Sequence, residues 1–188
     1  MKNKKLENSV RSLINLYTVV IGAALSLAVA RTIDINIGLD SVGATAILLF
    51  VCFVATLFPF FHGALRHLDD AHIENNSAHI KTGALIIDFI LLFLHALAFV
   101  VLSQLLQRPA HFAWFLIAVL GIDVIWGLFA HFGSSSEGEL SAESRWTIIN
   151  VLFIAAVLFY LVNNGISLTY NHDPVKLSAL LAIACLIR

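Results

Sequence analysis

Residues 82–130 read TGALIIDFILLFLHALAFVVLSQLLQRPAHFAWFLIAVLGIDVIWGLFA, two long apolar runs separated by a short polar link. Each run reaches the length of about 20 residues that an α-helix needs to cross a bilayer. The link RPA (108–110) is so short that we expect the two helices to be antiparallel neighbours. This stretch therefore predicts a transmembrane helical hairpin, and it decides the fold class of the chain.

The composition of the whole chain agrees with this hairpin. The 188 residues are 60% hydrophobic and only 12% charged, and the mean hydropathy is +0.91. Soluble domains carry about 25% charged residues. Because backbone groups in lipid must be hydrogen-bonded internally, the apolar runs should be helices. We therefore expect an all-α, polytopic integral membrane bundle that forms one transmembrane domain over residues 1–188, with the lipid bilayer as its environment.

Five runs have the length of a membrane span, and a sixth is shorter. The five cover residues 12–30, 41–61, 82–107, 112–130 and 146–162. The sixth covers residues 175–187, and its apolar part reaches roughly half of the hydrocarbon core. A short span, a re-entrant segment and an interfacial helix all fit it, and we favour the short span. The expected bundle has five to six transmembrane helices, with inner loops at residues 62–81 and 131–145.

The basic residues predict the orientation. Cytoplasmic segments of membrane proteins carry an excess of lysine and arginine. A cytoplasmic N-terminus puts seven such residues inside and three outside. Those inside are Lys2, Lys4, Lys5, Arg11, Arg66, Lys81 and Arg145, and those outside are Arg31, Arg108 and Lys176. We predict a multi-pass protein of the cell membrane with a cytoplasmic N-terminus. The net charge of −1 argues against a nucleic-acid surface.

Four ionisable residues of the hairpin stand out because charges inside a membrane are costly and usually have a partner. They are Asp88, His95, Asp123 and His131. Residues equally distant from the RPA link should lie at one depth, which sets His95 level with Asp123 and Asp88 level with His131. Asp88 and His95 are seven residues apart and share a helix face to about 20°. Asp123 and His131 are eight apart and differ by about 80°, so the pair of His95 with Asp123 is the stronger prediction.

These polar pairs have two possible roles. Pairs between membrane helices can hold the helices together, at about 0.6 kcal/mol each. Asp and His chains also form proton relays, because burial moves their pKa values towards each other and towards neutral pH. The sequence alone does not choose between these two roles.

The stretch FPFFHGALRHLDDAHIENNSAH (58–79) makes the first inner loop rich in histidine. Pro59 should kink the second span near its end. We expect the helix to continue beyond it as a solvated, partly amphipathic cytoplasmic helix that binds a soluble cytoplasmic partner. Its candidate contact residues are His62, Arg66, His67, Asp69 and Asp70. The H-x4-H spacing is similar to the histidine boxes of membrane desaturases, but the adjacent His-His pairs of those enzymes are absent, so we predict no metal site. Haem held by His62 and His131, at the inner ends of two spans, stays an alternative to the absence of any cofactor.

Three functions follow from these features. The first is a homo-oligomeric proton or cation channel or transporter that uses the buried Asp and His residues. The second is a membrane sensor or scaffold subunit that signals through its cytoplasmic loops to a soluble partner. The third, a haem-binding or histidine–metal membrane enzyme, ranks last because no nucleophile elbow, phosphate loop or metal box is present, and we favour a protein that is not an enzyme. Cys52 and Cys185 lie in separate apolar runs and are expected to be buried, unpaired thiols.

Overall fold

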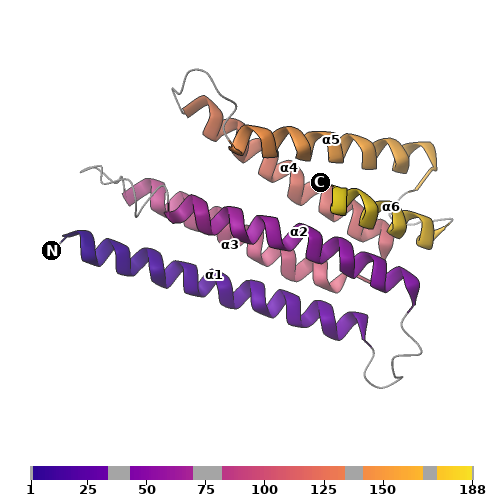
Figure 1. Cartoon of the computed structure of the whole chain (residues 1–188), viewed down its shortest axis with the longest axis horizontal. Helices are drawn as coiled ribbons and strands as arrows, with labels where there is room; N and C mark the ends of the chain where they lie inside the picture. The colour runs from indigo at the N-terminus through magenta and orange to yellow at the C-terminus, as the bar shows by residue number, and fades with distance from the viewer. Residues whose placement is uncertain (1, 34–42, 70–81, 134–141, 167–172, 188) are drawn as a thin grey trace. The chain divides into compact units, whose positions relative to one another are not determined.

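The computed structural model describes residues 2–33, 43–69, 82–133, 142–166 and 173–187, and Figure 1 shows that these residues are helical almost throughout. No strand occurs in these ranges, so the prediction of an all-α protein is confirmed. Five of the helices are long and apolar enough to span a membrane, as predicted, and α6 is a shorter apolar helix. The six helices are α1 (Lys2–Thr32), α2 (Ala44–Asp69), α3 (Thr82–Gln104), α4 (Pro109–Gly133), α5 (Ala142–Asn163) and α6 (Pro174–Ile187).

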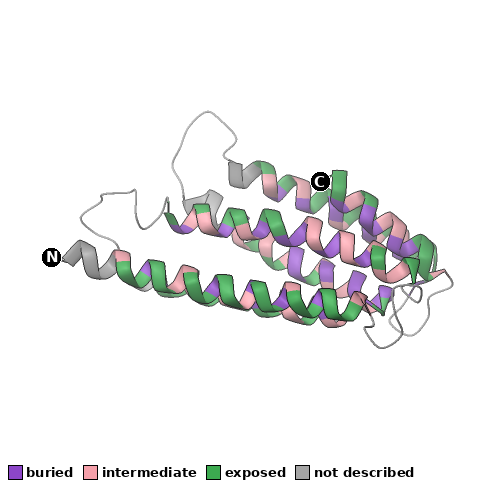
Figure 2. Cartoon of the chain, turned by 60° about the horizontal axis from the view of Figure 1, so that its bottom comes forward, coloured by how far each residue is buried: buried purple, intermediate pink, exposed green. Residues whose placement is uncertain are grey.

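The outward faces of the helices are apolar. Figure 2 shows exposed positions along every helix, with the buried positions in stripes between them. Large apolar side chains occupy many of these exposed positions, and Val19, Phe159 and Val162 are 67%, 74% and 71% exposed. Soluble monomers rarely expose apolar patches of this extent. The surface therefore matches a lipid environment, and the chain is a multi-pass helical membrane protein.

The chain divides into two compact units. Unit 1 contains α1, the part of α2 from Phe53 onwards, and α3. Unit 2 contains the first part of α2 up to Cys52, together with α4, α5 and α6. Each unit brings together segments that are distant in sequence, so each has its own set of partners for the polar residues of its spans.

Contacts at a regular spacing join α2 and α3 in unit 1. Phe60 and His67, seven residues apart on α2, contact His95 and Asp88, which are seven apart in the reverse order on α3. This reversal is the signature of antiparallel neighbours. α1 joins them through the stacked rings of Tyr17 and Phe61, 5.8 Å apart. The contacts between α2 and α3 thus recur after two helical turns.

α2 continues beyond the predicted second span into the first inner segment. The predicted span ends at residue 61, whereas α2 continues past Pro59 to Asp69. The extension is helical because its apolar side chains have a place to pack. Leu68 lies in a buried cluster with Val10 of α1 and Leu85 of α3. The expected continuation of the helix beyond Pro59 is therefore confirmed, and residues 62–69 form two turns of helix in unit 1.

Close packing joins α4 and α5 in unit 2. Gly127 of α4 is buried, and a Cβ atom there would overlap Oγ1 of Thr147 on α5. Glycine permits this approach of two backbones, as small residues do between membrane helices. α5 then ends in a Schellman motif at Gly165, whose φ is 60°, with Ile166 N–H donating to the Leu161 carbonyl at 2.9 Å.

α6 begins at a well-formed N-cap. The Asp173 carboxylate accepts a hydrogen bond from the backbone N–H of Lys176 at 3.1 Å, and Pro174 occupies the first helical position. This backbone hydrogen bond, with the Lys176 ammonium group 3.0 Å away, holds the pKa of Asp173 below its ordinary value. The cap sets the start of a helix whose buried face is mainly apolar.

Candidate functional site

A buried acid contacts a histidine between α2 and α3. Asp88 lies on α3 and its Oδ2 is 3.4 Å from Nε2 of His67 on α2. The Asp88 side chain is only 10% exposed, whereas that of His67 is 34% exposed. A carboxylate in an apolar span is costly unless a partner compensates its charge. The contact therefore joins a carboxyl group to an imidazole, two side chains that are each able to bind a proton.

His95 forms a second titratable position on the same face of α3. Its Nδ1 is 2.9 Å from the carbonyl oxygen of Leu91. Since a carbonyl oxygen only accepts hydrogen bonds, Nδ1 carries the proton and Nε2 keeps its lone pair in the neutral ring. Nε2 is buried and has no hydrogen-bond partner in the described part of the chain. His95 therefore offers a basic nitrogen, inside the bundle, that is able to accept a proton.

The two positions are separated along the helix. Asp88 and His95 are seven residues apart, which corresponds to about 10 Å along the axis of α3. The ring of Phe60 packs against His95, with 5.7 Å between the ring centroids. A proton that passes between them therefore needs more than a direct hydrogen bond.

Aromatic rings continue from His95 along the interface of unit 1. Phe60 contacts Phe99 edge to face at 5.5 Å, and Phe99 contacts Phe53 in the same manner at 6.0 Å. Phe53 and Phe99 are fully buried. Offset and edge-to-face packing of this kind is the favoured arrangement of aromatic pairs. The rings fill the interface beyond His95 with apolar material.

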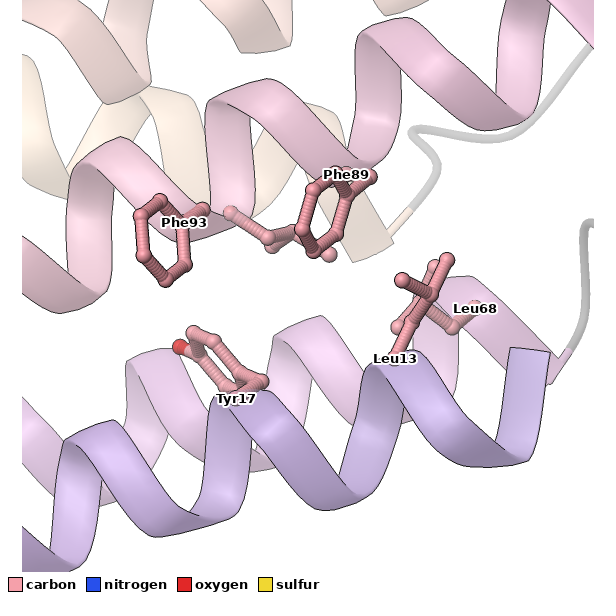
Figure 3. Close-up of a pocket in the computed structure, with 6 residues that line it drawn as sticks. Leu13, Tyr17, Leu68, Phe89 and Phe93 are labelled. Carbon is pink, nitrogen blue, oxygen red and sulfur yellow. The ribbon is translucent and has the colours of Figure 1, made fainter. Parts of the chain in front are cut away.

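A small apolar groove lies between helices of unit 1 (Figure 3). The side chains that line it come from α1, α2 and α3, and they are Leu13, Tyr17, Leu68, Phe89, Leu92 and Phe93. Phe89 directly follows Asp88, so the groove borders the same turn of α3. Its lining contains no charged group.

The second intramembrane acid, Asp123, has a different environment in unit 2. Its Oδ2 accepts a hydrogen bond from Nε1 of Trp146 at 3.1 Å and another from Nδ2 of Asn150. Both partners lie on α5, and Asn150 is fully buried. Indole and amide groups do not titrate in the physiological range. Asp123 is thus held by donors whose charge is constant.

The structure gives some predicted site residues partners that the sequence did not indicate. Asp88 contacts His67, which the prediction placed in a loop that binds a partner. The side chain of His131 lies outside the described residues, so the predicted pair of Asp88 with His131 stays a prediction. His95 and Asp123 belong to different units, and their pairing also stays a prediction.

Two signals would have indicated the observed partners. A helix carried beyond Pro59 places His67 two turns from Phe60 on one face of α2, level with the similarly spaced residues of α3. Asn150 is a polar residue inside an apolar span, and such residues commonly hydrogen-bond across helices. Neither signal identifies the partner without knowledge of which helices are adjacent.

The remaining predicted contact residues lie at the end of α2. His62, Arg66 and Asp69 are exposed on this helix, and Asp70 lies outside the described residues. The haem alternative pairs His62 with His131, so the structure does not test it. Within the described ranges, no group of three or more His, Cys, Asp or Glu residues is arranged to hold a metal ion.

Comparisons with known proteins add no family to this picture. No family model, no curated protein and no solved structure matches the chain. The function is therefore argued from the site itself.

Proposed function

We propose that the protein moves protons, or a cation coupled to protons, across the membrane, and that Asp88, His67 and His95 exchange the protons. The observation that supports this most is the contact of a buried carboxylate with an imidazole between two apolar helices. Ionisable residues in spans are costly, and they commonly mark ion pathways and proton relays.

The pair of Asp88 and His67 is suited to take up and release one proton. With a proton on His67, the pair carries opposite charges that compensate each other. Loss of that proton leaves the buried Asp88 carboxylate uncompensated, which is unfavourable in a region of low dielectric constant. A second cation that binds the carboxylate relieves this cost, so release of the proton favours uptake of a cation. The same pair therefore supports either proton transfer or exchange of a proton for a cation.

His95 provides a further group that can bind a proton, seven residues after Asp88 on α3. Its buried Nε2 lone pair accepts a proton at a position about 10 Å from Asp88 along the helix. Water molecules or a movement of side chains would have to bridge this distance. The ring of Phe60, which packs on His95, is placed to control such a step.

The aromatic packing favours a transporter over an open channel. Phe53, Phe60 and Phe99 contact one another in a row beyond His95. A continuous water path through this interface requires the rings to move. Alternating access provides that movement in transporters, and small chains commonly complete such a pathway by association. A homo-oligomer in the cell membrane, with a cytoplasmic N-terminus, is part of the proposal.

Proton flux into liposomes tests this function. Purified protein is reconstituted in vesicles that contain a pH-sensitive dye, and a potassium gradient with valinomycin drives proton entry. We expect the variant His67→Gln to lose flux by about tenfold, because glutamine keeps polarity but does not titrate. His62→Gln is the matched control, since His62 lies on the same end of α2 but is exposed. Equal flux for wild type, both variants and empty vesicles would refute the proposal.

A sensor or scaffold subunit is the second candidate, and the end of α2 favours it. His62, Arg66 and Asp69 are exposed there, within about one and a half turns of His67, which contacts the buried acid. Protonation of His67 would thus change a nearby polar surface that a soluble protein can bind. Proximity labelling from a tag on the N-terminus, compared between wild type and Arg66→Glu, tests this role. One soluble protein lost in the variant supports it, and an unchanged labelled set contradicts it.

A further inference from the structure

Two cysteines that are distant in sequence meet in unit 2. Cys52 lies on α2 and Cys185 lies on α6, 133 residues further along the chain. Their Sγ atoms are 2.7 Å apart, and the side chains are 0% and 5% exposed. Both side chains are buried, as the sequence predicts, but the sequence does not predict their contact.

Regular packing brings the two thiols together. Leu177, Leu181 and Cys185 follow one another at intervals of four residues on the buried face of α6. Leu49 and Cys52 are buried three residues apart on the first part of α2. Both spacings place the thiols on the inward stripe of their helices. Burial of a cysteine as a small apolar residue explains the low exposure. It does not require the two sulphur atoms to meet.

We propose that Cys52 and Cys185 form a reversible dithiol–disulfide couple that a lipid-soluble, quinone-class oxidant converts to the disulfide. The two S–H bonds break and one S–S bond forms. Two protons and two electrons pass to the quinone, which becomes the quinol. A dithiol reductant returns the disulfide to two thiols. The oxidised form links α2 covalently to the last turn of α6.

The apolar surroundings of the two thiols favour one class of oxidant. Oxidation of two thiols to one disulfide releases two protons together with two electrons. The acceptor must then take protons as well as electrons, and a quinone takes two of each. Ile183 and Leu186, on either side of Cys185, are 58% and 66% exposed on an apolar helix. These side chains face the phase from which an oxidant has to approach, so a compound dissolved in lipid is favoured over a water-soluble one.

The proposal is tested on reduced protein in lipid nanodiscs. The probe is a fully substituted benzoquinone with an alkyl tail, because its ring has no free position to alkylate a thiol. After incubation the protein is denatured in detergent and treated with a polyethylene-glycol maleimide, which retards each free thiol on a gel. We expect both thiols to disappear together, the intact mass to fall by two hydrogen atoms, and dithiothreitol to restore both thiols.

A variant that moves one thiol is the matched control. The double variant Val51→Cys with Cys52→Ser keeps two thiols but turns one of them by about 100° around α2. We expect it to lose its thiols about tenfold more slowly than wild type, because a disulfide requires Cβ atoms within a narrow distance. Circular dichroism shows beforehand that the variant has kept its helices.

Three results would overturn the proposal. The first is a wild-type protein that keeps both thiols in the presence of the quinone, which needs no variant to interpret. The second is equal rates for wild type and the double variant. The third is faster oxidation by aqueous oxidised glutathione than by the quinone, which would exclude an oxidant from the lipid phase.

Discussion

Asp88 in unit 1 and Asp123 in unit 2 are both acids inside predicted spans, but their partners differ in kind. Asp88 contacts His67, whose imidazole is able to bind and release a proton. Asp123 accepts hydrogen bonds from Trp146 and Asn150, whose charge does not change. The first arrangement is suited to proton exchange, and the second is suited to holding α4 against α5.

This difference shows how one residue type supports two roles in a membrane. The role depends on whether the partner can change its charge together with the acid. Unit 2 also contains the close approach of Gly127 to Thr147, which is one turn of α4 away from Asp123. The acid of unit 2 thus belongs to a packed helix contact, whereas the acid of unit 1 faces a partly exposed histidine.

The largest expected effect separates the two acids by activity. Asp88→Asn removes the titrating carboxylate from the site, so we expect proton flux in liposomes to fall by about a hundredfold, or about 2.7 kcal/mol. Asp123→Asn keeps a hydrogen-bond acceptor for Trp146 and Asn150, and we expect flux within about twofold of wild type. The measurement is the initial rate of dye quenching per reconstituted protein.

The opposite result would reverse the assignment of roles. A large loss in Asp123→Asn with normal flux in Asp88→Asn would place the exchange site in unit 2. Equal losses in both variants, with both proteins folded, would mean that the two acids act in one pathway and that the comparison between them does not hold.

The second prediction concerns the rigidity of unit 2. Gly127→Ala should lower the free energy of unfolding by about 2 kcal/mol, because the added Cβ overlaps Thr147 Oγ1 and forces α4 and α5 apart. Gly121→Ala is the control on the same helix, since a Cβ there meets nothing within 4 Å. It should leave stability unchanged or raise it slightly. Unfolding in detergent, followed by circular dichroism, measures both.

A third prediction tests the structural role of Asp123. Asp123→Ala leaves the Nδ2 donor of the buried Asn150 without this acceptor, so we expect a loss of about 1–2 kcal/mol in the same assay. Asn150→Leu in the Asp123→Ala background should recover part of that loss, because it removes the unsatisfied amide. An Asp123→Ala protein as stable as wild type would show that the hydrogen bonds to Asp123 contribute little.

The smallest effect is expected at the cap of α6, outside both acid sites. Asp173→Ala removes the acceptor for the Lys176 N–H, so amides in the first turn of α6 should exchange about threefold faster. Since the folded pKa of Asp173 is lowered, its stabilisation is present above the ordinary pKa of about 3.9 and is lost as the pH falls through the folded value. Hydrogen exchange at neutral and acidic pH measures this, and a rate in wild type independent of that titration would contradict it.

Several features of the fold were predictable from local sequence because they depend on local chemistry. A run of about 20 apolar residues in lipid must form a helix, since only a helix satisfies its own backbone. This argument placed the five long helices, and the apolar run at 175–187 is the helix α6. It did not place the end of α2, because residues 62–69 lie beyond the apolar run and are partly polar. Tertiary packing of Leu68 against Val10 and Leu85 extends that helix.

The partners of the polar residues were decided only by the tertiary structure. The sequence placed Asp88, His95 and Asp123 inside apolar spans and Cys52 and Cys185 in apolar runs, because an apolar run can be read residue by residue. It did not indicate that Asp88 meets His67, that Asp123 meets Asn150, or that the two thiols meet. Each of these contacts joins different helices, and it depends on which faces pack together. That choice is made by the summed packing of many side chains, which no single stretch of sequence contains.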